Sequence, residues 1–123
     1  MKIFISMGFN GRTDLEVLRR RDEIINIIKS KWSEIKDEDI MDNFVKDIPS
    51  YLEDDHRRVW CLGDSIRIMA EADLIIFDHD YNKFTGCRME HAITREYLGL
   101  NIGYITPDDT IDYAEYPPQN FAL

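Results

Sequence analysis

Apolar residues along the chain form three short runs, separated by longer stretches in which they recur at helical spacing. The runs cover residues 2–6, 73–78 and 100–105, and the middle run, DLIIFD, is continuous between two aspartates. A run without in-and-out alternation is typical of a strand that is buried on both faces, as in the centre of a parallel sheet. We therefore predict three strands of one sheet that is covered on both faces.

Three helices are predicted between these strands. The first begins at Thr13, since Thr13 and Glu16 have the spacing of a capping box, and ends near Lys31. The second covers about residues 55–71, and the third covers about residues 86–98, where Gly99 is expected to end it. The faces predicted to pack in the core carry Leu18, Ile24, Ile25, Ile28 and Trp32 in the first helix, Val59, Leu62, Ile66, Met69 and Ala70 in the second, and Met89, Ala92, Ile93 and Tyr97 in the third.

The remaining segments have weaker patterns. Residues 37–45 are predicted as an edge strand and residues 46–56 as a loop. Residues 106–123 contain two prolines in tandem, and we expect a tail with little regular structure that is either loosely attached or, the alternative we favour slightly, docked on a neighbouring subunit. A chain of 123 residues has the size of one domain, so residues 1–123 are predicted to form a single α/β domain.

The charge balance narrows the range of partners. The formal net charge is −9, whereas binding to a nucleic acid polymer requires a basic face. No apolar stretch is long enough to span a membrane and the first run is too short for a signal peptide, so we expect a cytoplasmic protein without a membrane partner. His56 and His79 form no recognisable metal set, and the glycine turn after residue 6 matches no cofactor fingerprint, so we expect neither metal nor cofactor.

Residues 72–105 have the order strand, helix, strand of a βαβ unit. Ligands of such units bind beyond the carboxyl ends of the strands. The turn at residues 8–12 has two glycines, ends in Arg12 and follows the first strand, so its backbone N–H groups are placed to hold an anion at the same end. The other candidate residues at this end are Asp78, Asp80, Thr85, Gly86 and Glu90.

Asp78 and Glu90 are the first candidates for catalysis. Glu90 lies early in its helix, where the helix N-terminus stabilises the anion, which suits a nucleophile or a stabiliser of positive charge better than an acid. Asp78 leaves an apolar strand, and partial burial there is expected to raise its pKa and suit it to protonate a leaving group. Two carboxylates in different environments are a general design for cleaving a bond to an anomeric carbon. The ordinary alternative is a structural role for both residues, with Asp78 as a cap and Glu90 as a partner of the helix dipole. The neighbouring His91 is expected on the exposed side of the helix.

Four short motifs occur in order along nearly the whole chain. They are ISMGFNGRT at residues 5–13, LGDS at 62–65, AEAD at 70–73 and GCRMEH at 86–91. Together they resemble the nucleoside 2-deoxyribosyltransferase-like family, in particular its small bacterial and phage-type members. The resemblance implies a three-layer, flavodoxin-like or Rossmann-like parallel sheet of four to five strands. It also implies a homo-oligomer, a dimer or higher, whose neighbouring subunits help to close the site.

The activity that the resemblance implies is cleavage of the N-glycosidic bond of a (deoxy)nucleoside or its 5′-monophosphate. Glu90 corresponds to the family's nucleophile, and Asp78 or Asp80 to the acid that contacts the base and assists its departure. The implied substrate-binding residues are Ser6, Met7, Gly8, Asn10, Gly11, Arg12, Thr85, Gly86 and Arg88. The chain departs from the family pattern in two places. Gly8 stands where small members have a proline, and residues 83–88 replace an aspartate–glycine loop. In this segment Lys83 and Arg88 could hold a phosphate, which favours a nucleotide over a free nucleoside as the substrate.

Two other functions are compatible with the same pattern. One is a non-catalytic protein of this fold that binds a nucleotide or a nucleotide-derived signal, and the other is a structural or interaction protein with a vestigial pocket. The residues do not distinguish transfer to a second base from hydrolysis, or one base and sugar from another.

Overall fold

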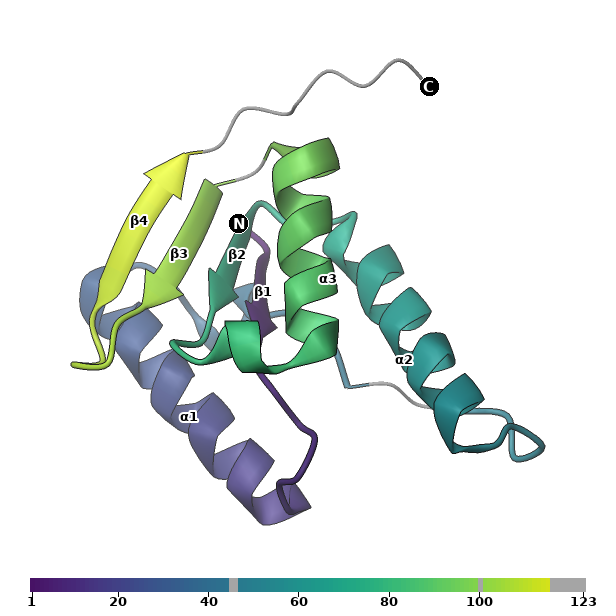
Figure 1. Cartoon of the computed structure of the whole chain (residues 1–123). Helices are drawn as coiled ribbons and strands as arrows, with labels where there is room; N and C mark the ends of the chain where they lie inside the picture. Colours follow the sequence, from purple (N-terminus) through teal and green to yellow (C-terminus); the bar gives the residue numbers. More distant parts are fainter. Residues whose placement is uncertain (45–46, 100, 116–123) are drawn as a thin grey trace.

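A four-stranded mixed sheet forms the centre of the computed structural model, which describes residues 1–44, 47–99 and 101–115 (Figure 1). Strands β1 (Ile3–Ser6), β2 (Leu74–Phe77), β3 (Asn101–Ile105) and β4 (Ile111–Glu115) lie side by side in this order. The first three are parallel, and β4 is antiparallel to β3. The predicted α/β class and the three strands are confirmed, but the sheet is not parallel throughout.

The helices begin and end close to where the sequence places them. Helix α1 spans Asp14–Lys31, α2 spans Asp54–Met69 and α3 spans Thr85–Ile93, and a π-helical turn, η3 (Thr94–Leu98), continues α3. The capping box at Thr13 is present, because its side chain accepts from the Glu16 N–H and the Glu16 carboxylate accepts from the Thr13 N–H. Gly99 ends η3 in the left-handed conformation, with φ of 56°.

Two apolar clusters form the core, one on each face of the sheet. Alternate residues of β1 and β2 pack with α1 on one face, and the cluster contains Ile3, Ile5, Val17, Ile24, Ile28, Leu74 and Ile76. The other residues of these strands pack with the end of α2, and that cluster contains Phe4, Met69, Ile75, Phe77 and Ile102. Every residue of β1 and β2 is buried, as their continuous apolar runs predict. In α1, Val17 takes the inward position and the predicted Leu18 is exposed.

Residues 37–44 border β1, but they do not form the predicted edge strand. A short 3₁₀ turn, η1 (Asp37–Asp39), leads into an isolated bridge between Ile40 and Ile3. The Met41 N–H donates to the Ile3 carbonyl oxygen at 2.9 Å, and the Asn43 side chain donates to the Ile5 carbonyl oxygen at 3.0 Å. The side-chain amide of Asn43 therefore replaces a backbone hydrogen bond that a neighbouring strand would make. In this way the edge of β1 is covered without a regular strand.

The segment expected to be an irregular tail contains β4. Residues 106–110 form the turn between β3 and β4, in which the Thr106 N–H donates to the Thr110 carbonyl oxygen at 2.8 Å. Asp109 adopts a left-handed φ of 58°, a conformation that aspartate tolerates in hairpin turns. The prediction of little regular structure is wrong for residues 111–115. Residues 116–123, for which docking on a neighbouring subunit was predicted, lie outside the described residues.

The predicted inward stripe of α2 is only partly covered. Among the residues of α2, all of which the structure describes, Met69 alone is buried, and Val59 and Trp60 are exposed. The first half of this helix projects away from the sheet (Figure 1).

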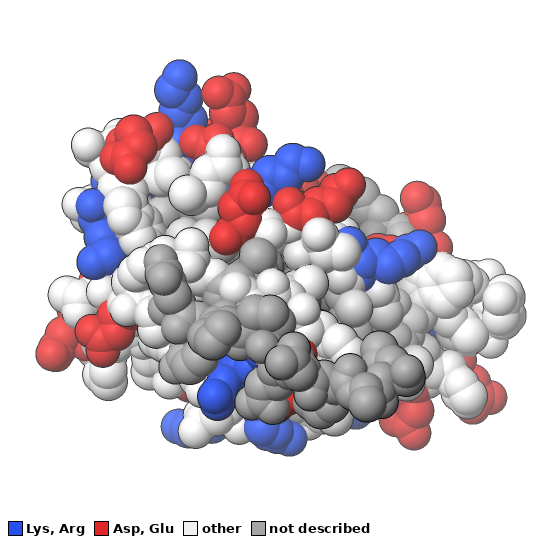
Figure 2. Space-filling view, turned by 90° about the horizontal axis from the view of Figure 1, so that it is seen from above, with Lys and Arg blue, Asp and Glu red and all other residues white. Residues whose placement is uncertain are grey.

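Within the described ranges, no helix has the length and hydropathy needed to cross a membrane. On the face seen in Figure 2, acidic and basic side chains lie interspersed.

Candidate functional site

Glu90 of α3 meets Ser6, the last residue of β1, in the interior of the protein. The Ser6 hydroxyl donates to Glu90 Oε1 at 2.8 Å, and the two residues are 1% and 7% exposed. Burial raises the pKa of Glu90 to about 7, and the hydrogen bond from Ser6 offsets part of that effect. The prediction of a stabilised anion is wrong, because Glu90 is beyond the first turn of α3 and burial outweighs the helix dipole.

The face of α3 that packs inward is polar and differs from the predicted face. Cys87, Glu90 and Thr94 are buried, whereas Met89 and Tyr97 are exposed. The Thr94 hydroxyl donates to the Glu90 carbonyl oxygen at 2.8 Å. Burial raises the pKa of the Cys87 thiol to about 11, so this cysteine is a neutral thiol at physiological pH.

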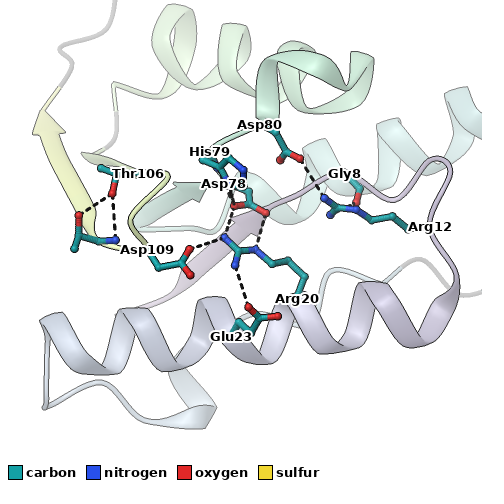
Figure 3. A network of polar contacts seen from close by, with 10 residues as sticks. Gly8, Arg12, Arg20, Glu23, Asp78, His79, Asp80, Thr106 and Asp109 are labelled. Atoms are coloured by element: carbon teal, nitrogen blue, oxygen red, sulfur yellow. Dashed lines mark hydrogen bonds and ion pairs between the residues drawn. The ribbon is translucent and has the colours of Figure 1, made fainter.

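Asp78, directly after β2, is bound by Arg20 of α1 (Figure 3). The guanidinium donates from Nε to Oδ2 at 3.0 Å and from Nη2 to Oδ1 at 2.8 Å, and the His79 N–H donates to Oδ1 at 2.8 Å. Burial by itself would raise the pKa of Asp78, which is 0% exposed, but these donors outweigh burial and lower the pKa. The prediction of a raised pKa is wrong, and Asp78 is a poor proton donor.

The glycine turn after β1 is joined to the loop after β2 through Arg12. Its guanidinium donates to Asp80 Oδ2 at 3.1 Å and to the Gly8 carbonyl oxygen at 2.9 Å, and it lies 5.4 Å from the centre of the Phe84 ring. Gly8 packs so closely on Phe84 that an added Cβ would lie 2.3 Å from the ring. Asp80 Oδ1 is enclosed and has no hydrogen-bond partner within the described part of the chain. Figure 3 shows Arg12 and Asp80 facing one another across this junction.

The other predicted binding residues surround this junction with different exposure. Met7 is buried, while Asn10 and Gly11 lie at the exposed tip of the turn, where Gly11 has φ of 79°. Arg88 is exposed and donates to the Asn82 carbonyl oxygen at 2.9 Å and to Thr85 Oγ1 at 3.0 Å. The start of α3, with Thr85 and Gly86 exposed, is thus fixed by its own arginine.

A group of aromatic rings, which sequence reasoning missed, lies beside α3. Phe77, Tyr81, His91 and Tyr104 have ring centres 4.9 to 6.1 Å apart. His91 Nε2 is 2.6 Å from the Tyr104 hydroxyl oxygen, and burial, helped by Arg95, lowers the pKa of His91. The prediction of an exposed His91 is wrong. The available sequence signal was the βαβ unit predicted at residues 72–105, because pairing of its two strands brings Phe77 beside Tyr104.

Arg20 is the second residue that sequence reasoning missed. The buried face of α1 carries Val17, Ile24 and Ile28, and Arg20 lies three residues after Val17, on the same side of the helix. That spacing was the available signal. Arg21 instead donates to the Met41 carbonyl oxygen at 2.8 Å and to Asn43 Oδ1 at 3.1 Å.

Asp78, His79 and Asp80 form a group that resembles a metal site by distance. Their potential ligand atoms lie within 4.8 Å of one another. Arg20 already binds both oxygens of Asp78, and Arg12 binds one oxygen of Asp80. The two guanidinium groups in hydrogen-bond contact with these acids neutralise their charge and repel a cation. The three residues therefore fit an ion-pair network better than a metal centre.

Two hollows of the described surface lie away from Glu90. One, of about 450 Å³, lies between α1 and the segment at residues 37–40, and the other, of about 590 Å³, lies at the start of α2. Glu90, Asp78 and Asp80 line neither of them.

Comparison of the chain with known protein families, curated proteins and solved structures gives no match. The resemblance to the nucleoside 2-deoxyribosyltransferase-like family therefore depends on the four sequence motifs alone.

Proposed function

We propose that the protein cleaves the N-glycosidic bond of a (deoxy)nucleoside or its 5′-monophosphate, with Glu90 as the nucleophile. The observation that carries the proposal is the buried hydrogen bond between Glu90 and Ser6. It joins the two motifs that the resemblance assigns to the nucleophile and to the substrate-binding turn. A carboxyl group with a pKa near 7, enclosed at the carboxyl end of a sheet, is also typical of a functional residue.

The proposed reaction has two displacements at C1′ of the sugar. A carboxylate oxygen of Glu90 attacks C1′, a C1′–O bond forms, and the C1′–N bond breaks with its electron pair going to the base, which takes up a proton from water. A second base or a water molecule then attacks C1′, releases the Glu90 carboxylate and loses a proton. Two inversions give net retention at C1′.

The structure favours Asp80 over Asp78 as the group that contacts the departing base. Both oxygens of Asp78 accept from Arg20, so neither is free to serve a base. Asp80 uses one oxygen for Arg12 and keeps Oδ1 without a partner in the described ranges. An enclosed oxygen of this kind would gain a hydrogen bond from an N–H of the base. We therefore assign base contact to Asp80 and the positioning of β2 and α1 to Asp78.

Other parts of the proposal follow from the resemblance. They are the three-layer, flavodoxin-like arrangement, the assembly into a homo-oligomer, and a phosphate contact for Lys83 and Arg88. The presence of apolar clusters on both sheet faces supports the first of these. The phosphate contact is supported by the exposure of both side chains, Lys83 two residues before α3 and Arg88 in its first turn.

The test is incubation with a panel of deoxynucleosides and their 5′-monophosphates, with and without acceptor bases, followed by chromatography of the released base. We expect release by the wild type, with a rate that rises with pH through about 7, because only the ionised Glu90 attacks. Glu90→Gln should abolish release, and Glu34→Gln, at an exposed glutamate, should not change it. No release from any substrate, or release that survives Glu90→Gln, would exclude the proposed chemistry for this panel.

A non-catalytic nucleotide-binding protein is the second candidate. The ion pair between Asp78 and Arg20 favours such a binding protein, because it keeps one of the two expected catalytic acids ionised. Calorimetry with the same panel distinguishes the two, because a binder retains the ligand unchanged whereas the enzyme releases its base.

A further inference from the structure

The hollow between α1 and residues 37–40, the α1 hollow, is separate from the candidate site around Glu90, which does not line it. Its volume of about 450 Å³ lies within the range of about 300–1,000 Å³ that is usual for small-molecule sites. Ile25 of α1 and Ile40, which lies opposite in sequence terms at the end of residues 37–40, are half-buried and line it. The α1 hollow therefore has the size and the apolar surface to hold a small organic molecule.

Arg21 brings to the α1 hollow a cation that is bound only by neutral groups. Its guanidinium donates to the Met41 carbonyl oxygen at 2.8 Å and to Asn43 Oδ1 at 3.1 Å, and within the described ranges no carboxylate forms an ion pair with it. Burial lowers the pKa of Arg21, and the more distant charges of Asp42 and Asp22 offset part of that effect. A guanidinium has more N–H donors than these two hydrogen bonds use, so donors remain for the carboxylate of a ligand.

Asp22 brings to the same hollow a carboxylate that lacks a direct cationic partner. The other two charged residues that line the hollow, Lys29 and Asp37, form an ion pair with each other. Asp22 is exposed, and in the part of the chain that the structure describes it forms no ion pair. Its charge acts on Arg21 without contact between the two side chains. The α1 hollow therefore presents a positive and a negative group that lie near each other and are not paired.

We propose that the α1 hollow binds a free α-amino acid with an aliphatic side chain. The carboxylate of the ligand accepts from the Arg21 guanidinium, and its ammonium group donates to the Asp22 carboxylate. Both protein charges thereby gain a charge-assisted hydrogen bond. The side chain of the ligand packs on Ile25 and Ile40, and this contact removes apolar surface of the hollow from water.

A ligand with a single charge fits the α1 hollow less well than an amino acid does. A simple carboxylate or a phosphate would bind Arg21, but Asp22 would repel it. An amine would bind Asp22, but it would add a cation beside Arg21 and Lys29. An amino acid has no net charge and offers the complementary group to each side chain. The inference is independent of the reaction proposed for Glu90, because the two sites share no lining residue among those described.

The first test is a titration of the isotope-labelled full chain, followed by amide NMR, with L-leucine, L-isoleucine and L-valine. Isocaproate and isoamylamine, which are L-leucine without its ammonium group and without its carboxylate, are titrated in parallel. We expect shifts at residues 21–29 and 37–40, a Kd of about 1 mM or lower for at least one amino acid, and binding of both analogues that is weaker by about tenfold or more. No binding of the three amino acids at about 10 mM would overturn the proposal, as would shifts confined to residues around Glu90. Equal affinity for isocaproate would overturn it as well, because the hollow would then recognise an anion only.

The second test measures the same affinity in variants of the two charged residues. Asp22→Asn and Arg21→Lys should each weaken binding by about tenfold or more, because the first removes the charge that holds the ammonium group and the second removes the planar fork that holds the carboxylate. Glu23→Gln is the matched control, since it removes an exposed acid from the next position of α1, outside the hollow, and it should leave the affinity unchanged. Arg21 also holds Met41 and Asn43, so urea unfolding of each variant accompanies the titration, and Asp22→Asn, at an exposed position, decides the outcome if Arg21→Lys does not fold. Unchanged affinity in Asp22→Asn, or an equal loss in Glu23→Gln, would overturn the proposed site.

Discussion

Removal of Arg20 is the sharpest test of how the carboxyl end of the sheet is held together. Arg20→Met keeps an unbranched stem of similar reach but leaves the Asp78 carboxylate, 0% exposed, without its guanidinium. Breaking one partner of a buried ion pair costs about 3–5 kcal/mol, because the remaining charge is desolvated and unpaired. The contacts of Arg20 with the exposed Glu23 and Asp109 each add less than about 1 kcal/mol, so the loss of Asp78 pairing dominates.

Urea unfolding followed by circular dichroism measures this loss. With a slope of about 1.5 kcal/mol per molar, a loss of about 4 kcal/mol lowers the midpoint by about 2–3 M. Arg19→Met, at the exposed neighbouring arginine, is the matched control and should change the free energy of unfolding by less than about 0.5 kcal/mol. The double variant Arg20→Met/Asp78→Asn should recover most of the loss, because it removes the unpaired charge and keeps an acceptor for the His79 N–H.

The pH dependence supplies a second check on the same reasoning. Arg20 lowers the pKa of Asp78 in the folded state, so the pair contributes stability above the ordinary pKa of an aspartate, 3.8, and loses it as the pH falls below that value. The difference between wild type and Arg20→Met should therefore shrink in acid, where the variant's Asp78 is protonated. A variant within about 1 kcal/mol of wild type at pH 7, or a difference that grows in acid, would refute the assignment.

Two further predictions concern Gly8 and Glu90. Gly8→Ala should destabilise the protein by about 1–3 kcal/mol in the same unfolding assay, because its Cβ would lie 2.3 Å from the Phe84 ring, whereas Gly86→Ala, with open space at its Cβ, should be neutral or stabilising. Equal effects of the two substitutions would contradict the close packing. Burial raises the pKa of Glu90 from 4.5 to about 7, so the folded state loses about 3 kcal/mol as pH rises between these values. Glu90→Gln should therefore gain stability over wild type with rising pH across this range, and a pH-independent difference would show that Glu90 is not buried as described.

The strands and helix ends were predictable because local physical rules determine them. Continuous apolar runs identified β1 and β2, a capping box identified the start of α1, and Gly99 identified the end of η3. The strand β4 was missed because residues 111–115 are mixed in polarity and only Ile111 was a strong apolar signal. The segment Pro107–Thr110 has the composition of a hairpin turn and was the available signal.

The faces of the helices were less predictable than their ends. In α3 the apolar pattern placed Met89 and Tyr97 inward, while the structure buries Cys87, Glu90 and Thr94. Apolar spacing finds the inward face only where the core is apolar, and this helix packs its polar side against the end of β1. The partner of Asp78 was not predictable either, since pairing between α1 and the end of β2 depends on tertiary structure across 58 positions.

Asp78 and Glu90, the two candidate catalytic acids, are bound on opposite faces of the sheet. Asp78 is bound from α1 on one face, while Glu90 is bound by Ser6 beside the aromatic rings on the other. A helix that served packing alone would carry an apolar residue at position 90, since burial of a carboxyl group there opposes folding at neutral pH. The network around Asp78 is neutralised and has an ordinary structural role. For Glu90, within the part of the chain that the structure describes, one hydrogen bond from Ser6 offsets the cost of burying the carboxyl group. The function proposed for Glu90 would account for that cost, because perturbed carboxyl groups concentrate where chemistry or binding requires them. We therefore expect the proposed cleavage to depend on Glu90, with Asp78 acting only through the loop that carries Asp80.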